Sequence, residues 1–266
     1  MAARKILWEE HTWPELREAA AENRVVVIPV GTIEQHGPHL PLSTDCITSR
    51  EISRLVVEQV PEEALLMPQV YYSFNFHHLD FPGTVAVDGH TIIDYVTDIG
   101  KSVAHHGFRK ILLVNGHGSN VPFLDIAARN ICNHTEAVAA MVSWWSLADP
   151  ALSEVREAEH PGGLAHGCEL ETSVILHFRP DLVQLDKAER DISYPRSEFF
   201  YWDLQKPSPV YFQEFFSRNS RTGTQGDPMT ASAEKGRKVV ECVVGNMVRL
   251  LRDFRARPIA PRVDHH

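Results

Sequence analysis

The residues most able to do chemistry stand in a short stretch, 31–45, which follows an apolar run at 25–30. Glycine and two prolines break the stretch, and Glu34, His36 and Asp45 are spaced through it. Carboxylates and imidazoles on an irregular loop at the carboxyl end of a strand are the ligands that a hydrolytic metal centre requires. A polar surface loop is the alternative for these residues taken alone.

Further apolar runs predict three more strands, at 65–67, 110–114 and 137–145. Segments with helical spacing separate them, which indicates βαβ units and a mostly parallel sheet. We therefore expect an α/β fold in which residues 1–266 form a single three-layer α/β/α domain. Polar clusters follow the predicted strands, and ligands in such folds bind at the carboxyl ends of the strands.

Side chains from three of these strand ends match the ligand inventory of a dinuclear metal centre. They are Glu34, His36, Asp45, His117 and Glu169. Such a centre needs three or four oxygen and nitrogen ligands per ion, one of them a bridging carboxylate, with the ions about 3.5–4 Å apart. It would lower the pKa of a bridging water towards about 7 and make that water a nucleophile.

Composition narrows the class of partner. The net charge of −9 argues against nucleic acid and anionic membranes, and no apolar segment resembles a signal peptide or a membrane span. Four scattered cysteines without CxxC spacing suit reduced thiols. We expect a soluble cytoplasmic protein that acts on a small molecule, without nucleic-acid or membrane partners.

Five motifs along the chain carry a resemblance to a known family. They are Glu34-Gln-His36-Gly-Pro-His39-Leu-Pro41 with Asp45, Phe81-Pro-Gly-Thr84, Asn115-Gly-His117-Gly, His166-Gly-x-x-x-Glu171-Thr172 and Gly226-Asp-Pro228. Together they resemble the creatininase (creatinine amidohydrolase) family over nearly the whole chain. The resemblance implies a compact three-layer α/β domain, a homohexamer, and two divalent ions, zinc or manganese with ferrous iron as a further candidate.

The resemblance also implies an arrangement of ligands. Glu34, Asp45 and His117 would bind one ion, while His36, Asp45 and a further glutamate would bind the other, with Asp45 bridging. Creatininases resemble one another in placing a tyrosine and a metal-binding glutamate directly after the histidine of Asn-Gly-His. This chain has glycine and serine there. We expect Glu169 to replace the missing carboxylate, as in the family branches that read His-x-Gly-Glu-x-Glu-Thr.

Catalytic roles follow from the same resemblance. His166 matches the proton carrier of the family, and we expect Glu171 to orient His166 or a ligand. Candidate substrate contacts, each with a packing role as an equal alternative, are Ser73, Asn75, His77, Trp144 and Trp145. For His39 and His78 a structural role is an equal alternative, and neither is proposed as a metal ligand. The tryptophan that creatininases place four residues before the catalytic histidine falls at Gly162, so we expect a substrate other than creatinine.

We therefore predict a metal-dependent amidohydrolase that cleaves a non-peptide C–N bond in a small molecule, such as a cyclic amide or a formamide. Alternatives within the family are ring opening of a cyclic ketone such as a keto-inositol, hydrolysis of creatinine itself, and a non-catalytic metal-bound scaffold. Two alternatives lie outside it. One is a cysteine hydrolase that uses Cys168, and the other is a nucleotide-binding module at Gly116-His-Gly118.

Overall fold

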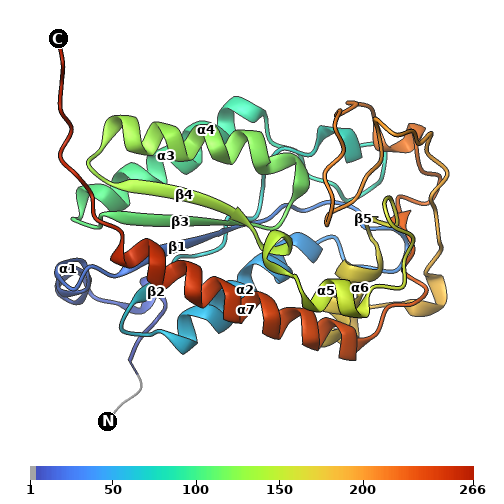
Figure 1. The fold of residues 1–266 in the computed structure, drawn as a ribbon, viewed down its shortest axis with the longest axis horizontal. Helices are drawn as coiled ribbons and strands as arrows, with labels where there is room; N and C mark the ends of the chain where they lie inside the picture. The colour runs from blue at the N-terminus through green and yellow to red at the C-terminus, as the bar shows by residue number, and fades with distance from the viewer. Residues whose placement is uncertain (1–3) are drawn as a thin grey trace.

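A parallel four-stranded sheet lies at the centre of the computed structural model, which describes residues 4–266 (Figure 1). The strand order is β2-β1-β3-β4, and every neighbouring pair is parallel. The strands are β1 (Val25–Val30), β2 (Ala64–Leu66), β3 (Lys110–Asn115) and β4 (Val138–Ser143). This confirms the expected α/β fold with a mostly parallel sheet.

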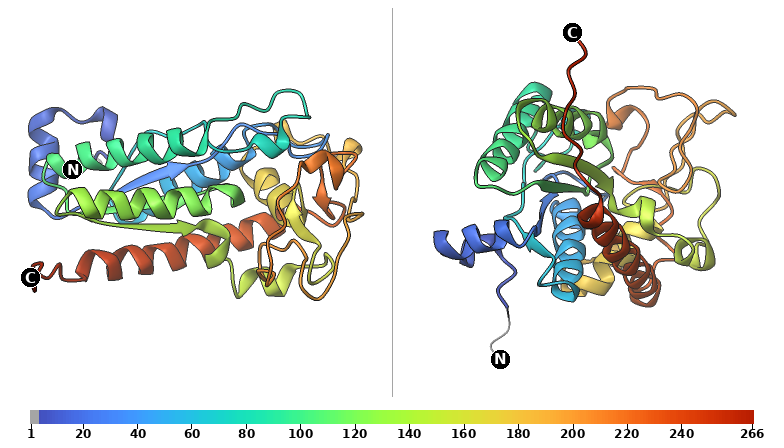
Figure 2. Two further views of the ribbon diagram at one scale, coloured as in Figure 1. Left: turned by 90° about the horizontal axis from the view of Figure 1, so that it is seen from above. Right: turned by 60° about the vertical axis from the view of Figure 1, so that its left-hand side comes forward.

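Helices cover both faces of the sheet, so that the structure has three layers (Figure 2). One face carries α3 (Gly89–His105) and α4 (Val121–His134), and the other carries α2 (Thr44–Gln59) and α7 (Ala233–Ala256). The strand β1 shows how the two cores form. Val25 and Val27 point into the core under α2 and α7, whereas the intervening residues Val26 and Ile28 point into the core under α3 and α4. A strand buried on both faces reads as a continuous apolar run, which is why it could be predicted.

The carboxyl end of the sheet carries the smaller elements (Figure 1). Here β5 (Leu164–His166) pairs antiparallel with β6 (Gln225–Gly226), and α6 (Glu169–Phe178) follows directly after β5. The other helices are α1 (Trp13–Ala21), which begins with a capping box between Thr12 and Glu15, and the short α5 (Ala151–Val155). Within residues 4–266, no helix is long and apolar enough to cross a membrane.

Candidate metal centre

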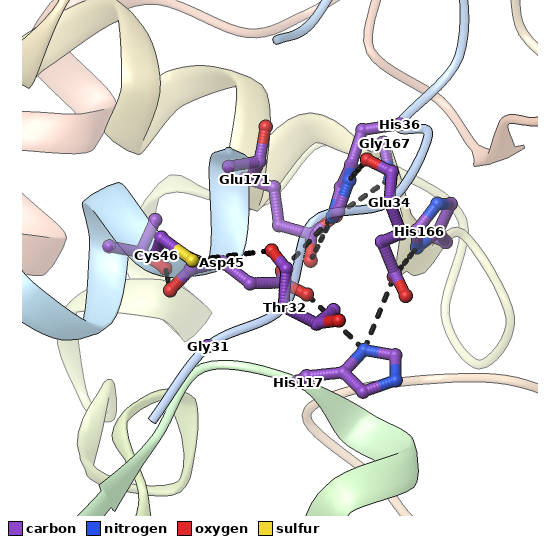
Figure 3. Close-up of polar contacts among 12 residues, drawn as sticks. Gly31, Thr32, Glu34, His36, Asp45, Cys46, His117, His166, Gly167 and Glu171 are labelled. Atoms are coloured by element: carbon purple, nitrogen blue, oxygen red, sulfur yellow. Dashed lines mark hydrogen bonds and ion pairs between the residues drawn. The ribbon is translucent and has the colours of Figure 1, made fainter. Parts of the chain in front are cut away.

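Four segments bring charged side chains together at the carboxyl edge of the sheet (Figure 3). The loop after β1 contributes Glu34 and His36, and the first turn of α2 contributes Asp45. His117 follows β3, and Glu171 stands in the first turn of α6. All five side chains are buried, and the candidate ligand atoms within each group of three lie within 4.8 Å of one another.

Two glycines allow the strands to approach α2 closely enough to place Asp45. A Cβ atom at Gly116 would lie 2.3 Å from the backbone oxygen of Asp45. A Cβ atom at Gly31 would lie 2.7 Å from the Cα atom of Cys46. No real side chain tolerates such distances, so β1 and β3 can both end against the first turn of α2 only because these positions are glycine. The first turn is also where a helix favours a carboxylate.

The first ligand group consists of Glu34, Asp45 and His117. The ring nitrogen Nδ1 of His117 lies 3.2 Å from Glu34 Oε1 and 3.2 Å from Asp45 Oδ2. Its other nitrogen, Nε2, lies 3.1 Å from the carbonyl oxygen of Phe74, which can only accept a hydrogen bond. In the neutral imidazole Nε2 is therefore the donor, and the lone pair of Nδ1 faces the two carboxylates. Three acceptors then converge on one point, as they do around a cation.

The second ligand group, His36, Asp45 and Glu171, follows the same logic. His36 Nδ1 lies 3.2 Å from the carbonyl oxygen of Glu34, which leaves Nε2 facing Asp45 Oδ1 at 3.0 Å and Glu171 Oε1 at 3.9 Å. The backbone N–H of Gly167 donates to Glu171 Oε2 at 2.7 Å, so one oxygen is anchored while the other faces the cluster. Asp45 therefore presents Oδ1 to one histidine and Oδ2 to the other.

The polar atoms of the cluster fit divalent cations. Both carboxylate oxygens of Glu34 and Oδ2 of Asp45 are buried without a hydrogen-bond donor. Unpaired buried oxygens of this kind are costly unless a cation binds them. Three buried carboxylates thus require positive charge at this site, and hard divalent ions prefer such oxygen and imidazole ligands.

Where no cation supplies this positive charge, protons on His36 and His117 supply it, as the pKa values of the two histidines show. Burial opposes charge on His36, but Asp45 outweighs it and raises the pKa of His36 to about 9. Burial likewise opposes charge on His117, yet Glu34 and Asp45 raise its pKa to about 10. Burial raises the pKa of Glu171 to about 7. For Asp45 the effect of burial is overcome by the adjacent histidines, which hold the pKa of its carboxyl well below the usual range.

His166 lies beside the cluster on β5. Its Nε2 donates to the carbonyl oxygen of Gln35 at 2.6 Å, and its Nδ1 lies 3.7 Å from Glu34 Oε1. Its ring centroid lies 4.1 Å from that of His36. Burial lowers the pKa of His166 well below the ordinary histidine value, and the charge of His36 lowers it further, so the ring is neutral with a free Nδ1 lone pair.

The structure places Glu169 outside this cluster, in contrast to the expectation that it replaces the missing ligand. Its carboxylate forms an ion pair with Lys235 of α7 and accepts the backbone N–H groups of Glu157 and Ala158 at 3.0 and 2.8 Å. Glu171 stands in the cluster instead. The reason is helical geometry, because residues two apart on a helix point about 200° away from each other.

Two predicted substrate contacts instead support the loop that carries Glu34. Ser73 donates to the carbonyl oxygen of Gly31 at 2.9 Å, and Asn75 donates to Thr32 Oγ1 and to the carbonyl oxygen of Ile33. Both side chains are buried. Their hydrogen bonds stabilise the irregular backbone between β1 and the candidate ligands. This is the packing role that the sequence offered as the alternative to substrate contact.

The remaining predicted contacts fall into two places. His77 lies beside the cluster, with its ring stacked on that of His117 at 5.9 Å and its Nε2 accepting from Ser119 Oγ at 3.1 Å. Trp144 and Trp145 lie elsewhere. Trp144 is buried in the hydrophobic core shared with α7, and Trp145 packs against the same core. A tryptophan has a large apolar area to bury, and for Trp144 that burial takes place in the core.

The two competing sites outside the metal centre find little support in the geometry. Cys168 is fully buried, and burial raises the pKa of its thiol well above the usual value, which disfavours a thiolate nucleophile. The Gly116-His-Gly118 turn presents His117 to the carboxylates, and Gly116 packs on α2. The glycines therefore serve the placement of a ligand.

Comparison with known proteins agrees with this geometry. The profile of the Creatininase family, described as creatinine amidohydrolase, matches residues 9–251. The chain belongs to the creatininase family. The creatinine amidohydrolase of Pseudomonas putida is 31% identical over 259 residues, which cover 92% of this chain and 95% of that protein.

Other creatininase-family relatives carry different names. The mycofactocin precursor peptide peptidase of Mycobacterium tuberculosis is 31% identical over 250 residues, covering 88% of this chain and 86% of that protein. The 3-dehydro-scyllo-inosose hydrolase of Thermotoga maritima is 24% identical over 273 residues, covering 95% and 84%. The family is thus one of hydrolases, and this chain is a creatininase-family hydrolase.

Solved creatininase structures share the fold and hold metal. A structure described as creatininase Mn has a TM-score of 0.80 at 29% identity, and covers 96% of this chain and 100% of that one. A mutant creatininase of Zn-Zn type has a TM-score of 0.79 at 29% identity, with the same coverage. Creatininases therefore bind zinc or manganese, and the buried cluster of this family member has the ligands for metal.

The structure places against the centre two residues to which the sequence assigned no catalytic, metal-binding or substrate-binding role. His78 accepts from Gln35 Nε2 at 2.8 Å, and its own Nε2 lies 3.6 Å from Glu34 Oε1. Phe216 packs on the rings of His78 and His166. Gln35, the hydrogen-bond partner of His78, stands between the predicted ligands Glu34 and His36 in the sequence, and this position could have indicated a role near the centre. Nothing in the sequence around Phe216 indicates such a role.

Proposed function

We propose that this creatininase-family hydrolase binds two divalent ions, zinc or manganese, and cleaves a non-peptide C–N bond in a small cyclic amide or a formamide. One ion is held by Glu34, Asp45 and His117, and the other by His36, Asp45 and Glu171. The observation that carries the proposal is the orientation of Asp45, whose Oδ1 faces His36 and whose Oδ2 faces His117. A carboxylate in that position would be able to bind both ions, one through each oxygen.

Bound divalent ions would supply a water of lowered pKa, towards about 7, and a Lewis acid for a substrate carbonyl. The protein then has to move a proton. His166 is suited to this step, because its Nε2 is fixed as a donor to Gln35 and its Nδ1 is free beside Glu34. Nδ1 takes the proton of the attacking water and returns it to the leaving nitrogen as the C–N bond breaks. Burial of the centre excludes bulk water from competing for that proton.

The proposal is tested by metal content and hydrolysis assays. After expression with zinc or manganese, elemental analysis is expected to find about two ions per chain. Asp45→Asn is expected to lose both ions and activity. Asp98→Asn is the matched control, because the Asp98 side chain is 72% exposed and belongs to neither ligand group. Retention of two ions by Asp45→Asn would contradict the bridging assignment.

Activity is measured over a panel of cyclic amides, formamides, creatinine and cyclic ketones. Turnover of an amide other than creatinine is the expected result. Hydrolysis confined to a cyclic ketone would mean that a C–C bond is the target. Full metal occupancy without turnover of any compound would favour a metal-bound scaffold.

A further inference from the structure

An aromatic residue covers two histidines at the edge of the candidate metal centre. Phe216, at the start of the short 3-10 helix η7 (Phe216–Arg218), is buried. Its ring is stacked on His78, with centroids 4.3 Å apart and planes at 29°, and meets His166 edge-on at 4.8 Å. The phenyl ring therefore lies directly against the histidine that we assign to proton transfer.

The ring belongs to an aromatic wall built by one irregular segment, residues 191–226. Figure 2 shows this segment, in orange, folded over the end of the molecule that holds β5. Trp202 packs behind Phe216 with centroids 5.5 Å apart, and Tyr194 packs on Trp202 at 5.8 Å. Paired hydrogen bonds between the backbones of Asp191 and Gly226, of 2.8 and 3.1 Å, close the base of the segment.

The same segment takes the space beside Gly162. The Gly162 backbone N–H donates to Asp203 Oδ2 at 2.7 Å, and a Cβ atom there would lie 3.1 Å from the hydroxyl oxygen of Tyr194. Gly162 also has a φ of +109°, which favours glycine. A side chain is disfavoured at this position, and the ring that contacts His166 comes from the segment 191–226.

We propose that Phe216 is a specificity-determining residue of this enzyme, whose ring contacts the non-reacting part of the substrate and limits that part to a small group. This inference rests on the proposed function. A small planar amide fits between the phenyl ring and the two histidines only when the ring moves aside by the thickness of one planar group, about 3.5 Å. A bulky substituent would have to displace Phe216 and the tryptophan packed behind it, which costs several aromatic contacts.

The test uses two hydroxamate probes that chelate metal through the same two oxygens. Acetohydroxamate carries a methyl group, and benzohydroxamate carries a phenyl group. For the zinc-loaded wild type we expect tighter binding of acetohydroxamate, measured by calorimetry. Phe216→Ala is expected to improve benzohydroxamate binding about tenfold while leaving acetohydroxamate within about threefold. An unchanged ratio of the two dissociation constants would overturn the proposal.

Matched variants separate this role from loss of structure. Phe215→Ala removes the neighbouring phenyl ring, which is 47% exposed, and is expected to leave both dissociation constants unchanged. Phe216→Leu keeps much of the apolar volume without the flat ring, and is expected to give an intermediate ratio. The zinc content and unfolding midpoint of each variant establish that the centre is intact. An effect of Phe215→Ala as large as that of Phe216→Ala would also contradict the assignment.

A second readout distinguishes failure of this inference from failure of the proposed function. If the purified protein binds no zinc, the metal proposal fails. The packing of Phe216 over His78 and His166 can still be tested with diethylpyrocarbonate, which acylates accessible histidines. Phe216→Ala is expected to speed labelling of His78 and His166 about tenfold, because their cover is removed. The exposed His90 serves as the internal reference. Equal labelling rates in the wild type and Phe216→Ala would reject Phe216 as the cover of the centre.

Discussion

Glu169 and Glu171 lie two residues apart on α6, but their carboxylates meet different surroundings. Glu171 has one oxygen bound by the Gly167 N–H and the other directed at the His36 imidazole. Glu169 neutralises Lys235 and receives two backbone N–H groups. The first arrangement leaves an oxygen free for a cation, whereas the second uses both oxygens in the protein.

Exchanging each carboxylate for an amide separates the two roles. Glu171→Gln is expected to lose about one of the two ions, together with activity, because an amide is a much weaker ligand. Glu169→Gln is expected to retain both ions but to lower the free energy of unfolding by about 1–3 kcal/mol, since buried partners lose a charge-assisted hydrogen bond. Elemental analysis and denaturant unfolding measure these effects. If Glu169→Gln loses an ion and Glu171→Gln does not, then Glu169 is the ligand and Glu171 is not.

At the scale of secondary-structure elements, the centre depends on how closely β3 ends against α2. Gly116 permits that approach because it has no side chain. A Cβ atom at this position would meet the backbone oxygen of Asp45 and, at 3.1 Å, Cβ of Ser49. The helix backbone cannot yield locally in the way that a flexible side chain can. Any side chain at position 116 must therefore move α2, and Asp45 moves with it.

Gly116→Ala is accordingly expected to destabilise the protein by about 1–3 kcal/mol through overpacking. It is also expected to lower metal occupancy, since displacement of the bridging carboxylate by about 1 Å spoils both ligand groups. Gly118→Ala is the matched control, because nothing lies within 4 Å of a Cβ atom there. Unfolding curves and elemental analysis compare the two. Equal metal content in both variants would show that the close approach is not needed.

At the scale of the whole molecule, α7 ties distant parts of the chain together. Near its start the N–H of Ser232 donates to Ser173 Oγ of α6 at 3.1 Å, and beyond its end Lys110 Nζ of β3 donates to the carbonyl oxygen of Arg257 at 2.5 Å. The same helix lines the core beneath the sheet. These contacts support our proposal that residues 1–266 act as a single domain.

We also expect this domain to assemble into a homohexamer, as the family resemblance implies. The aromatic segment exposes Phe199, Tyr211 and Phe212 to 58%, 71% and 55%, and adjacent exposed aromatic rings often mark protein contacts. Light scattering coupled to size exclusion is expected to give six times the chain mass of 30.0 kDa. The double variant Tyr211→Ser, Phe212→Ser should reduce this mass if the patch is a subunit contact. A monomer at micromolar concentration would contradict the expectation.

Local sequence was sufficient for much of the fold and for four of the proposed ligands. The buried strands could be predicted because both of their faces are apolar, which leaves continuous runs such as Val25–Val30. Glu34, His36 and His117 could be proposed because they closely follow such runs, and Asp45 because it begins the helix after the same loop. The ends of parallel strands meet at one edge of the sheet. Residues that lie close in sequence to the ends of parallel strands are therefore close to one another in the folded protein.

Tertiary packing decided the rest. The rotation of α6 against α7 determines that Glu171 and not Glu169 faces His36, and no property of either residue encodes that rotation. Packing likewise turns Trp144 into the core and places Phe216 on His166, fifty residues earlier in the chain. An irregular segment has no periodicity from which such a contact could be inferred, because its position results from the side chains that it buries.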